Sequence, residues 1–205
     1  MDHTSAAASI RSAAVLKRAA RAAARRTVRR PFPKRSWSEC GEDLILQHIF
    51  RHRHDGRFID VGAFEPKRRS NTYALHKMGW TGINIDAQPG SMKAFRRARP
   101  RDVNLEIGIG AKPGVMQFHM FAGTVSTFDE ELAKQHMANP KHKFKGVCEV
   151  EVATLSHVVR THCPSGVDLL LVDAEGFDLD VLRGNDWTTH RPEVVVVETL
   201  SWYAG

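Results

Sequence analysis

Acidic side chains recur where four predicted β-strands end. These strands are expected over residues 57–64, 81–87, 167–176 and 193–200, each built on a short apolar run. Parallel strands place their carboxyl ends along one edge of the sheet, and ligands of such proteins bind at that edge. The acidic residues that this arrangement brings to the edge are Asp60, Glu65, Asp86, Asp173, Glu175 and Glu198. The sequence therefore predicts an acidic ligand site there.

The turn after the first of these strands reads D-V-G-A-F-E-P. It lacks the G-x-G-x-x-G pattern of dinucleotide-binding proteins, and its one glycine, Gly62, cannot form a nest for a pyrophosphate. Asp86 lies 24 residues beyond Gly62, where an acid accepts hydrogen bonds from ribose hydroxyls. These features favour a cationic nucleoside without phosphate. S-adenosylmethionine is such a ligand, because nearby carboxylates would offset its sulfonium and α-amino charges.

Structural roles for the same acids remain open at this point. Asp60 could cap the following turn, and Asp86 could be the N-cap of a helix that begins at Pro89. Asp173 and Glu175 could likewise cap the helix expected over 177–186. All of these acids would then lie at the ligand edge by chance, which is the less favoured interpretation.

Helical patterns separate the strands along the chain. Strands that alternate with helices predict an α/β fold with a mostly parallel sheet covered on both faces. A strand over 115–121 is expected to pair with a neighbour across the Pro113–Gly114 turn. The remaining strands are expected over 102–110 and 145–155, and the helices over 67–79, 88–100, 156–163 and 177–186.

Basic residues concentrate at the N-terminus. Residues 1–35 hold ten lysines and arginines and one acid, whereas twenty basic and twenty-two acidic residues lie beyond position 35. We therefore divide the chain into an Ala- and Arg-rich arm over 1–35, helical or disordered, and a domain over 36–205. The domain gives no reason to expect nucleic-acid binding. The arm is compatible with a disordered or loosely helical basic extension, with a segment that weakly contacts an anionic membrane surface, or with an organellar transit peptide.

Cysteine usage and hydropathy bear on the compartment. The three cysteines include no C-x-x-C pair, which is typical of reduced thiols rather than of a disulfide framework or a zinc site. No apolar run approaches the roughly 18 residues that span a bilayer. We expect a cytoplasmic protein without a bound metal.

Several segments, in this order, resemble the FkbM family of methyltransferases. The most specific pieces are D-V-G-A with a following S-N-T and G-W-x-G, and D-x-E-G-x-x-x-x-V-L-x-G. The similarity runs from about Ser36 to Glu198. It implies a Rossmann-like class I methyltransferase fold, which is a three-layer sandwich, and S-adenosylmethionine-dependent O-methylation, often of sugar hydroxyls in glycans, glycolipids or polyketides. The segments are SWSECGEDLIL, RFIDVGAFEPKRRSNTYALHKMGWTGINIDA, STFDEEL, VDLLLVDAEGFDLDVLRG and RPEVVVVE.

The resemblance and the sheet edge together define the expected site. Methyl transfer from a sulfonium to an oxygen is an in-line displacement, so the protein aligns donor and acceptor and a general base assists the hydroxyl. Asp173 and Glu175 are the expected catalytic residues, although the residues alone favour a contact with the donor equally and also allow, as a less favoured role, coordination of a divalent cation. The expected cofactor-binding residues are Asp60, Gly62, Ala63, Glu65, Asn71 and Asp86.

Two departures from the family pattern raise alternatives. The acid of the second strand is Asp86, where the family often has Glu. The family's domain usually continues past the V-V-V-V-E strand, so we expect an apparently truncated C-terminus with a sticky edge over 193–200 that self-associates or pairs with a partner. The alternatives to an active enzyme on a small-molecule or glycan acceptor are a non-catalytic methyltransferase-like protein completed by a partner and, less favoured, a nicotinamide-dependent oxidoreductase.

Overall fold

The computed structural model describes residues 35–198. The expectations for the N-terminal arm and for the chain beyond Glu198 lie outside this range. Within it, no helix is long and apolar enough to cross a membrane.

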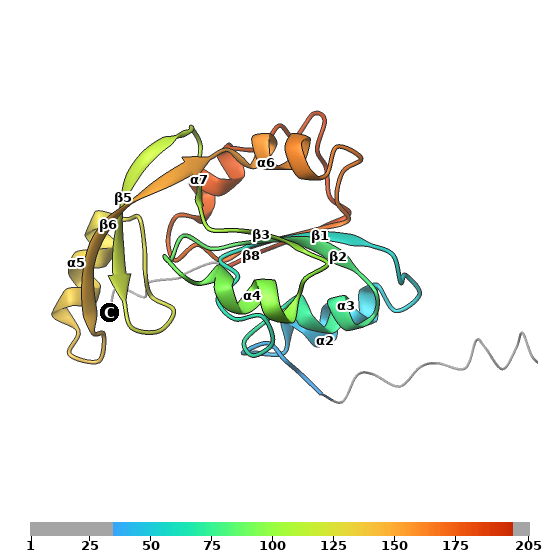
Figure 1. Ribbon diagram of the computed structural model, residues 1–205, viewed down its shortest axis with the longest axis horizontal. Helices are drawn as coiled ribbons and strands as arrows, with labels where there is room; N and C mark the ends of the chain where they lie inside the picture. The colour runs from blue at the N-terminus through green and yellow to red at the C-terminus, as the bar shows by residue number, and fades with distance from the viewer. Residues whose placement is uncertain (1–34, 199–205) are drawn as a thin grey trace, which may run out of the picture. The chain divides into compact units, whose positions relative to one another are not determined.

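A five-stranded parallel sheet forms the centre of the domain (Figure 1). The chain builds it outward from β1 to β3 on one side and from β7 to β8 on the other, so the strand order reverses between β1 and β7. This is the topological switch point at which such sheets bind ligands. The predicted mostly parallel α/β sheet is confirmed. In spatial order the strands are β3 (Val103–Leu105), β2 (Thr81–Ile85), β1 (Arg57–Val61), β7 (Leu169–Val172) and β8 (Val194–Val197).

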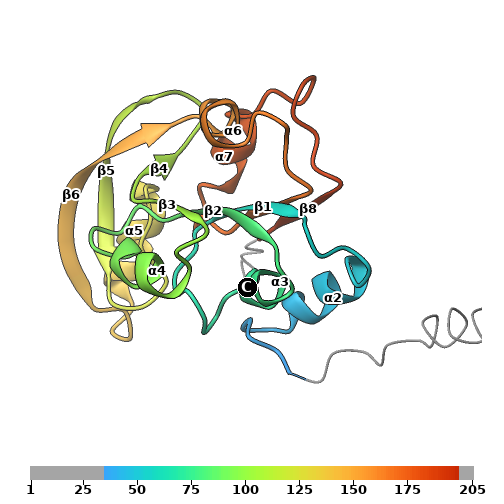
Figure 2. The same ribbon diagram turned by 45° about the vertical axis from the view of Figure 1, so that its right-hand side comes forward.

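Alternate residues of the central strands build one apolar layer on each face of this sheet. Ile59 and Leu170 pack with Val158 on one face, and Phe58 and Leu171 pack with Trp80 on the other. Helices cover both layers, as the three-layer arrangement requires (Figures 1 and 2). One face carries α6 (Leu155–His162) and α7 (Asp178–Arg183), and the other carries α2 (Glu42–Ile49), α3 (Tyr73–Lys77) and α4 (Met92–Ala98).

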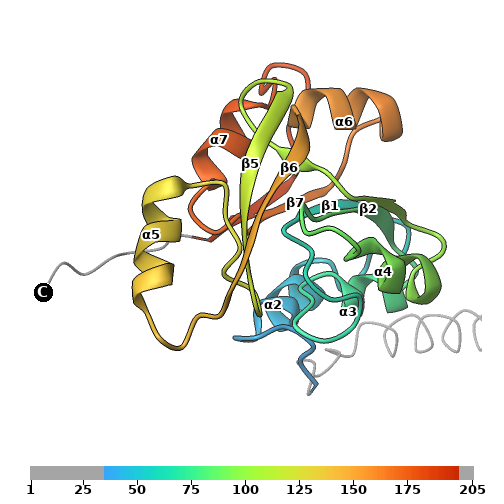
Figure 3. The same ribbon diagram turned by 60° about the vertical axis from the view of Figure 1, so that its left-hand side comes forward.

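A smaller three-stranded sheet lies beside the central one, with one helix against it (Figure 3). Its long strands pair antiparallel, and Phe118 and Val150 are buried on it. Its elements are β4 (Gly108–Ile109), β5 (Gly114–Phe121), β6 (Phe144–Ala153) and helix α5 (Glu130–Ala138).

This sheet corrects two predictions. The strand expected over 102–110 is divided into β3 and β4, which belong to different sheets. Gly108 allows β4 to lie against Phe128, because a side chain at this position would overlap the ring. The strand over 115–121 pairs with β6, not across the Pro113–Gly114 turn. β5 forms eight register pairs with β6, whereas β4 has only two residues to offer, and Pro113 has no N–H for a hairpin.

Two helices begin later than their patterns predict. The helix expected over 67–79 starts at Tyr73, because residues 67–72 form a turn in which Arg69 has a φ of 51°. The helix expected over 88–100 starts at Met92, after Gly90 with a φ of 85°. Both connections leave the carboxyl ends of β1 and β2 and border the cavity described next.

Candidate functional site

A cavity of about 380 Å³ lies at the carboxyl ends of β1, β2 and β7. Its size is within the range of small-molecule sites. A segment of the smaller sheet, around Phe118 and Phe128, forms its opposite wall. The cavity brings together every residue that the sequence predicts for the site, namely Asp60, Gly62, Ala63, Glu65, Asn71, Asp86, Asp173 and Glu175. Glu198, which the sequence also places at this edge, borders the cavity as well.

Gly62 lies where the turn after β1 passes close to the main chain of Asp173, after β7. Its φ is 88°, and a side chain there would overlap the carbonyl oxygen of Asp173. The N–H groups of Gly62 and Ala63 both donate to the carbonyl of Ile85, at 2.9 and 3.0 Å. The turn is therefore tied to the ends of both neighbouring strands, and only glycine fits it.

Asp60 lies at the floor of the cavity and is 7% exposed. Its Oδ2 accepts a hydrogen bond of 2.7 Å from the hydroxyl of Thr72. Burial raises the pKa of Asp60 above its ordinary value, and this hydrogen bond opposes the shift. The carboxylate therefore has one fixed partner in the protein and one side on the cavity.

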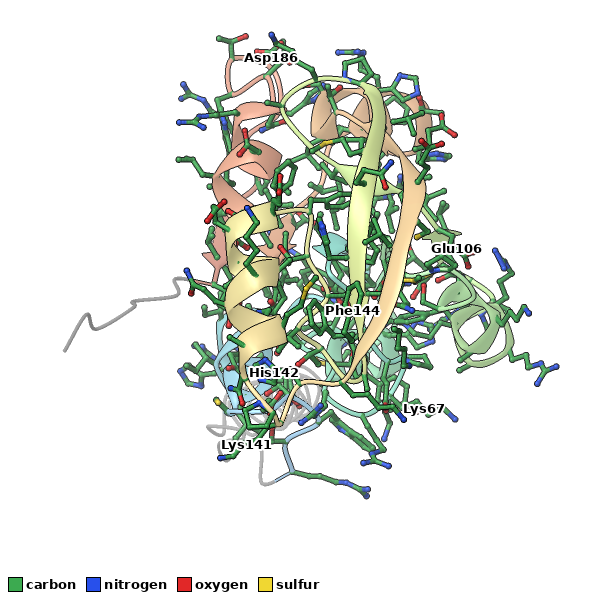
Figure 4. The ribbon with its side chains drawn as sticks, turned by 90° about the vertical axis from the view of Figure 1, so that its left-hand side faces the viewer. Lys67, Glu106, Lys141, His142, Phe144 and Asp186 are labelled. Atoms are coloured by element: carbon green, nitrogen blue, oxygen red, sulfur yellow. The ribbon has the colours of Figure 1, made fainter. Side chains whose placement is uncertain are left out.

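Asp86 follows β2 and is half-buried in the turn that leads to α4. Its Oδ1 accepts a hydrogen bond of 2.6 Å from the N–H of Gln88. Burial raises its pKa to about 7, and the charge of Glu106, which lies beside α4 (Figure 4), adds to this shift. The N-cap of α4 is Ser91, so the interpretation of Asp86 as the N-cap of a helix at Pro89 is wrong.

Three carboxyl groups that follow β7 and β8 lie close together at the cavity. Oxygens of Asp173, Glu175 and Glu198 all lie within 4.8 Å of each other. Although Asp173 is accessible from the cavity, desolvation and the neighbouring Glu198 raise its pKa to about 8. Burial, with the charge of Asp173, raises the pKa of Glu175 to about 7. The raised pKa values of Asp173 and Glu175 lie near neutral pH. The spacing of the three carboxyl groups also suits the oxygen ligands of a divalent cation.

The loop that carries Glu175 has its own internal support. Asp178 accepts hydrogen bonds from the N–H groups of Ala174 and Gly176, at 2.8 and 3.2 Å. The N-cap of α7 is Phe177, and it makes no side-chain hydrogen bond there. The interpretation of Asp173 and Glu175 as caps of this helix is therefore wrong.

The opposite wall is aromatic and comes from the smaller sheet. Phe128 packs between Phe118 and Phe177, with ring centroids at 4.7 and 5.4 Å. Thr127 donates a hydrogen bond of 2.8 Å to the carbonyl of Glu175, which joins this wall to the acidic loop. Behind the wall, α5 ends near His142 and Phe144 (Figure 4).

Sequence reasoning assigned no site role to this wall. Thr127 and Phe128 lie in STFDEEL, a segment that carries part of the family resemblance, and this was the available signal. The segment reaches the cavity only because β5 pairs with β6, which follows it in the chain.

The electrostatics of the cavity select against phosphate. Among the described lining residues, Arg69 is the one lysine or arginine, and it forms an ion pair of 3.1 Å with Glu39. The other ionisable lining side chains are carboxylates and the thiol of Cys40. A pyrophosphate would have no free cation here, whereas a cationic ligand finds several carboxylates.

Comparison with known proteins gives one result. A family model described as the methyltransferase FkbM domain matches residues 60–204. Searches of curated proteins and of solved structures found no match.

Proposed function

Because the chain belongs to the methyltransferase FkbM domain family, we propose that it transfers a methyl group from S-adenosylmethionine to a hydroxyl of a sugar, glycan or related natural product. The observation that carries this proposal is the acidic cavity at the switch point, which is built around Gly62 and whose described lining residues offer no free lysine or arginine to a phosphate. It suits a nucleoside that is cationic at sulfur and at the α-amino group.

The donor's binding residues follow from the three strand ends. The main chain at Gly62 and Ala63 lets the methionine part approach closely. Asp60, on the cavity floor, would receive the α-ammonium, and Asp86 would accept hydrogen bonds from the ribose hydroxyls. Glu65 and Asn71 border the same side of the cavity.

The acceptor's side of the cavity would carry the proton transfer. A neutral hydroxyl is a poor nucleophile, so a base whose pKa lies near the working pH assists its attack. The pKa values of Asp173, about 8, and Glu175, about 7, meet this condition. The aromatic wall around Phe128 would shield the reacting groups from water, and alignment of donor and acceptor would supply the rest of the acceleration.

Isothermal titration with S-adenosylmethionine, S-adenosylhomocysteine and NAD tests the donor assignment. We expect both S-adenosyl compounds to bind and NAD to bind at least a hundredfold more weakly. A screen for S-adenosylhomocysteine release with glycans and hydroxylated natural products then tests turnover. Binding without turnover on any acceptor would favour a non-catalytic methyltransferase-like protein, and tight binding of NAD would refute the donor assignment.

A further inference from the structure

Arg99 is a fully buried cation behind the cavity. Its side chain has no exposed area and packs over the rings of Phe58 and Phe95, at 5.1 and 5.7 Å from their centroids. Its Nε donates a hydrogen bond of 2.8 Å to Asp102, which is also fully buried. Burial of a guanidinium costs free energy unless its N–H groups are hydrogen-bonded. The contacts of Arg99 therefore indicate a role beyond packing.

Two hydrogen bonds connect Arg99 to Asp60. The Nη1 of Arg99 donates to the hydroxyl oxygen of Thr72 at 3.0 Å, and that hydroxyl donates to Asp60 at 2.7 Å. Arg99 and Thr72 have no exposed area, and Asp60 is nearly buried. The hydroxyl accepts from a cation and donates to a carboxylate, an orientation in which each bond strengthens the other.

The charges in this buried group do not balance. Asp60 and Asp102 are two acids, and Arg99 is one fixed cation. His76 lies 3.2 Å from Asp102, but burial lowers its pKa, so it is mostly neutral at pH 7. One further positive charge would complete the group, and the side of Asp60 that is free to receive it borders the cavity.

We propose that Thr72 and Arg99 are positioning residues of the donor site, which hold the Asp60 carboxylate ionised and oriented toward the α-ammonium of S-adenosylmethionine. This inference rests on the proposed function. Asp102 disfavours the ionised form of Asp60, and Asp60 in turn raises the pKa values of Asp86 and Asp173. The hydrogen bond from Thr72 and the charge of Arg99 are the two opposing influences on Asp60.

The experiment compares Thr72→Val, which removes the hydroxyl, with Thr72→Ser, which keeps it. Thr161→Val is the matched control, because Thr161 lies in α6 and its exposed hydroxyl donates to His157. The first readout needs no donor: the pKa of Asp60 is followed by carboxyl ¹³C NMR. We expect a rise of at least one pH unit in Thr72→Val, and values near wild type in Thr72→Ser and Thr161→Val.

The second readout is ligand affinity. We expect Thr72→Val to bind S-adenosylmethionine and S-adenosylhomocysteine at least tenfold more weakly, because both carry the α-ammonium. Methylthioadenosine lacks the amino-acid part, so its affinity should stay within twofold. Thr72→Ser should restore the affinity for both S-adenosyl compounds.

The outcomes separate this inference from the proposed function. If wild-type protein does not bind S-adenosylmethionine, the proposed function fails, while the titration of Asp60 still tests the connection to Arg99. An unchanged Asp60 pKa in Thr72→Val, or an equal loss of affinity for methylthioadenosine, would overturn the inference. If Thr72→Val does not fold, Arg99→Lys replaces it, because lysine keeps the charge but cannot reach Asp102 and Thr72 together. The same rise in the pKa of Asp60 is then expected, and its absence would overturn the inference.

Discussion

Asp60 on one side and Asp173, Glu175 and Glu198 on the other border the same cavity, and they differ in what surrounds them. Asp60 has the hydroxyl of Thr72 beside it and the guanidinium of Arg99 behind it. Asp173, Glu175 and Glu198 have mainly one another, and within the described range no ion pair reaches any of these three. Asp60 therefore lies near the fixed positive charge of Arg99, whereas no such charge pairs with the other three acids among the described residues.

This difference predicts different chemistry on the two sides of Gly62. A carboxylate with a fixed cationic network is suited to bind a cation without moving protons. Carboxyl groups that raise each other's pKa toward neutrality are suited to accept a proton and release it again. We therefore expect the side of Asp60 to bind the donor and the side of Asp173 to serve the acceptor.

The largest expected effect comes from removing the proton acceptors. The double variant Asp173→Asn/Glu175→Gln should lower kcat by about 10²–10⁴, the usual contribution of general acid–base catalysis. Its Kd for S-adenosylmethionine should stay within about threefold. Steady-state turnover and isothermal titration measure the two quantities. A collapse of donor affinity with little change in kcat would show that these acids contact the donor and would break the division proposed above.

The next effect concerns the glycine that joins the two groups. Gly62→Ala places a methyl group against the carbonyl of Asp173 and keeps a left-handed backbone. We expect the free energy of unfolding to fall by about 3 kcal/mol or more, from the overlap together with the backbone strain. Gly166→Ala is the control, because Gly166 has a φ of 87° and open space around it. It should cost about 1–2 kcal/mol in urea denaturation, from the backbone alone. Equal losses in both variants would mean that the contact with Asp173 is relieved by a small shift.

Asp86 tests the donor side alone. Asp86→Ala should weaken S-adenosylmethionine binding by about 1.5–3 kcal/mol, the range for hydrogen bonds to a charged group. The binding of free methionine, which has no ribose, should not change. Titration calorimetry with both ligands measures this. A change of less than twofold for S-adenosylmethionine would leave Asp86 as a turn residue that only accepts from Gln88.

The sequence was most informative where the contacts are local. The ends of β1, β2 and β7 follow from short apolar runs, so all eight predicted site residues border one cavity. The aromatic wall was missed because it depends on the long-range pairing of β5 with β6. Arg99 was missed because the segment R-R-A-R over 96–99 consists mostly of arginine, a residue that is usually exposed. Arg99 is the C-cap of α4, seven and four residues after the buried Met92 and Phe95, and this helical spacing was the available signal.

The smallest expected effect is a pair of opposite pH dependences. Asp86, Asp173 and Glu175 have pKa values of about 7, 8 and 7, above their ordinary values, so the folded state binds more protons than the unfolded state from about pH 4 to pH 8. The stability that protonation provides is therefore lost as pH rises through this window, and the Tm of the ligand-free protein should fall between pH 5.5 and 7.5. Donor affinity should rise over the same interval, by at most tenfold per pH unit, because Asp86 accepts hydrogen bonds from the ribose hydroxyls more strongly when it is ionised.

The two trends can be assigned to their groups by substitution. Scanning calorimetry across the pH range gives the first trend, and titration calorimetry with S-adenosylmethionine gives the second. Asp173→Asn should reduce the pH dependence of Tm more than the pH dependence of donor affinity, since we place Asp173 on the acceptor's side. Asp86→Asn should flatten both. A Tm that rises with pH in the ligand-free wild type would mean that a cation already neutralises these carboxylates, and the contrast with Asp60 would then be lost.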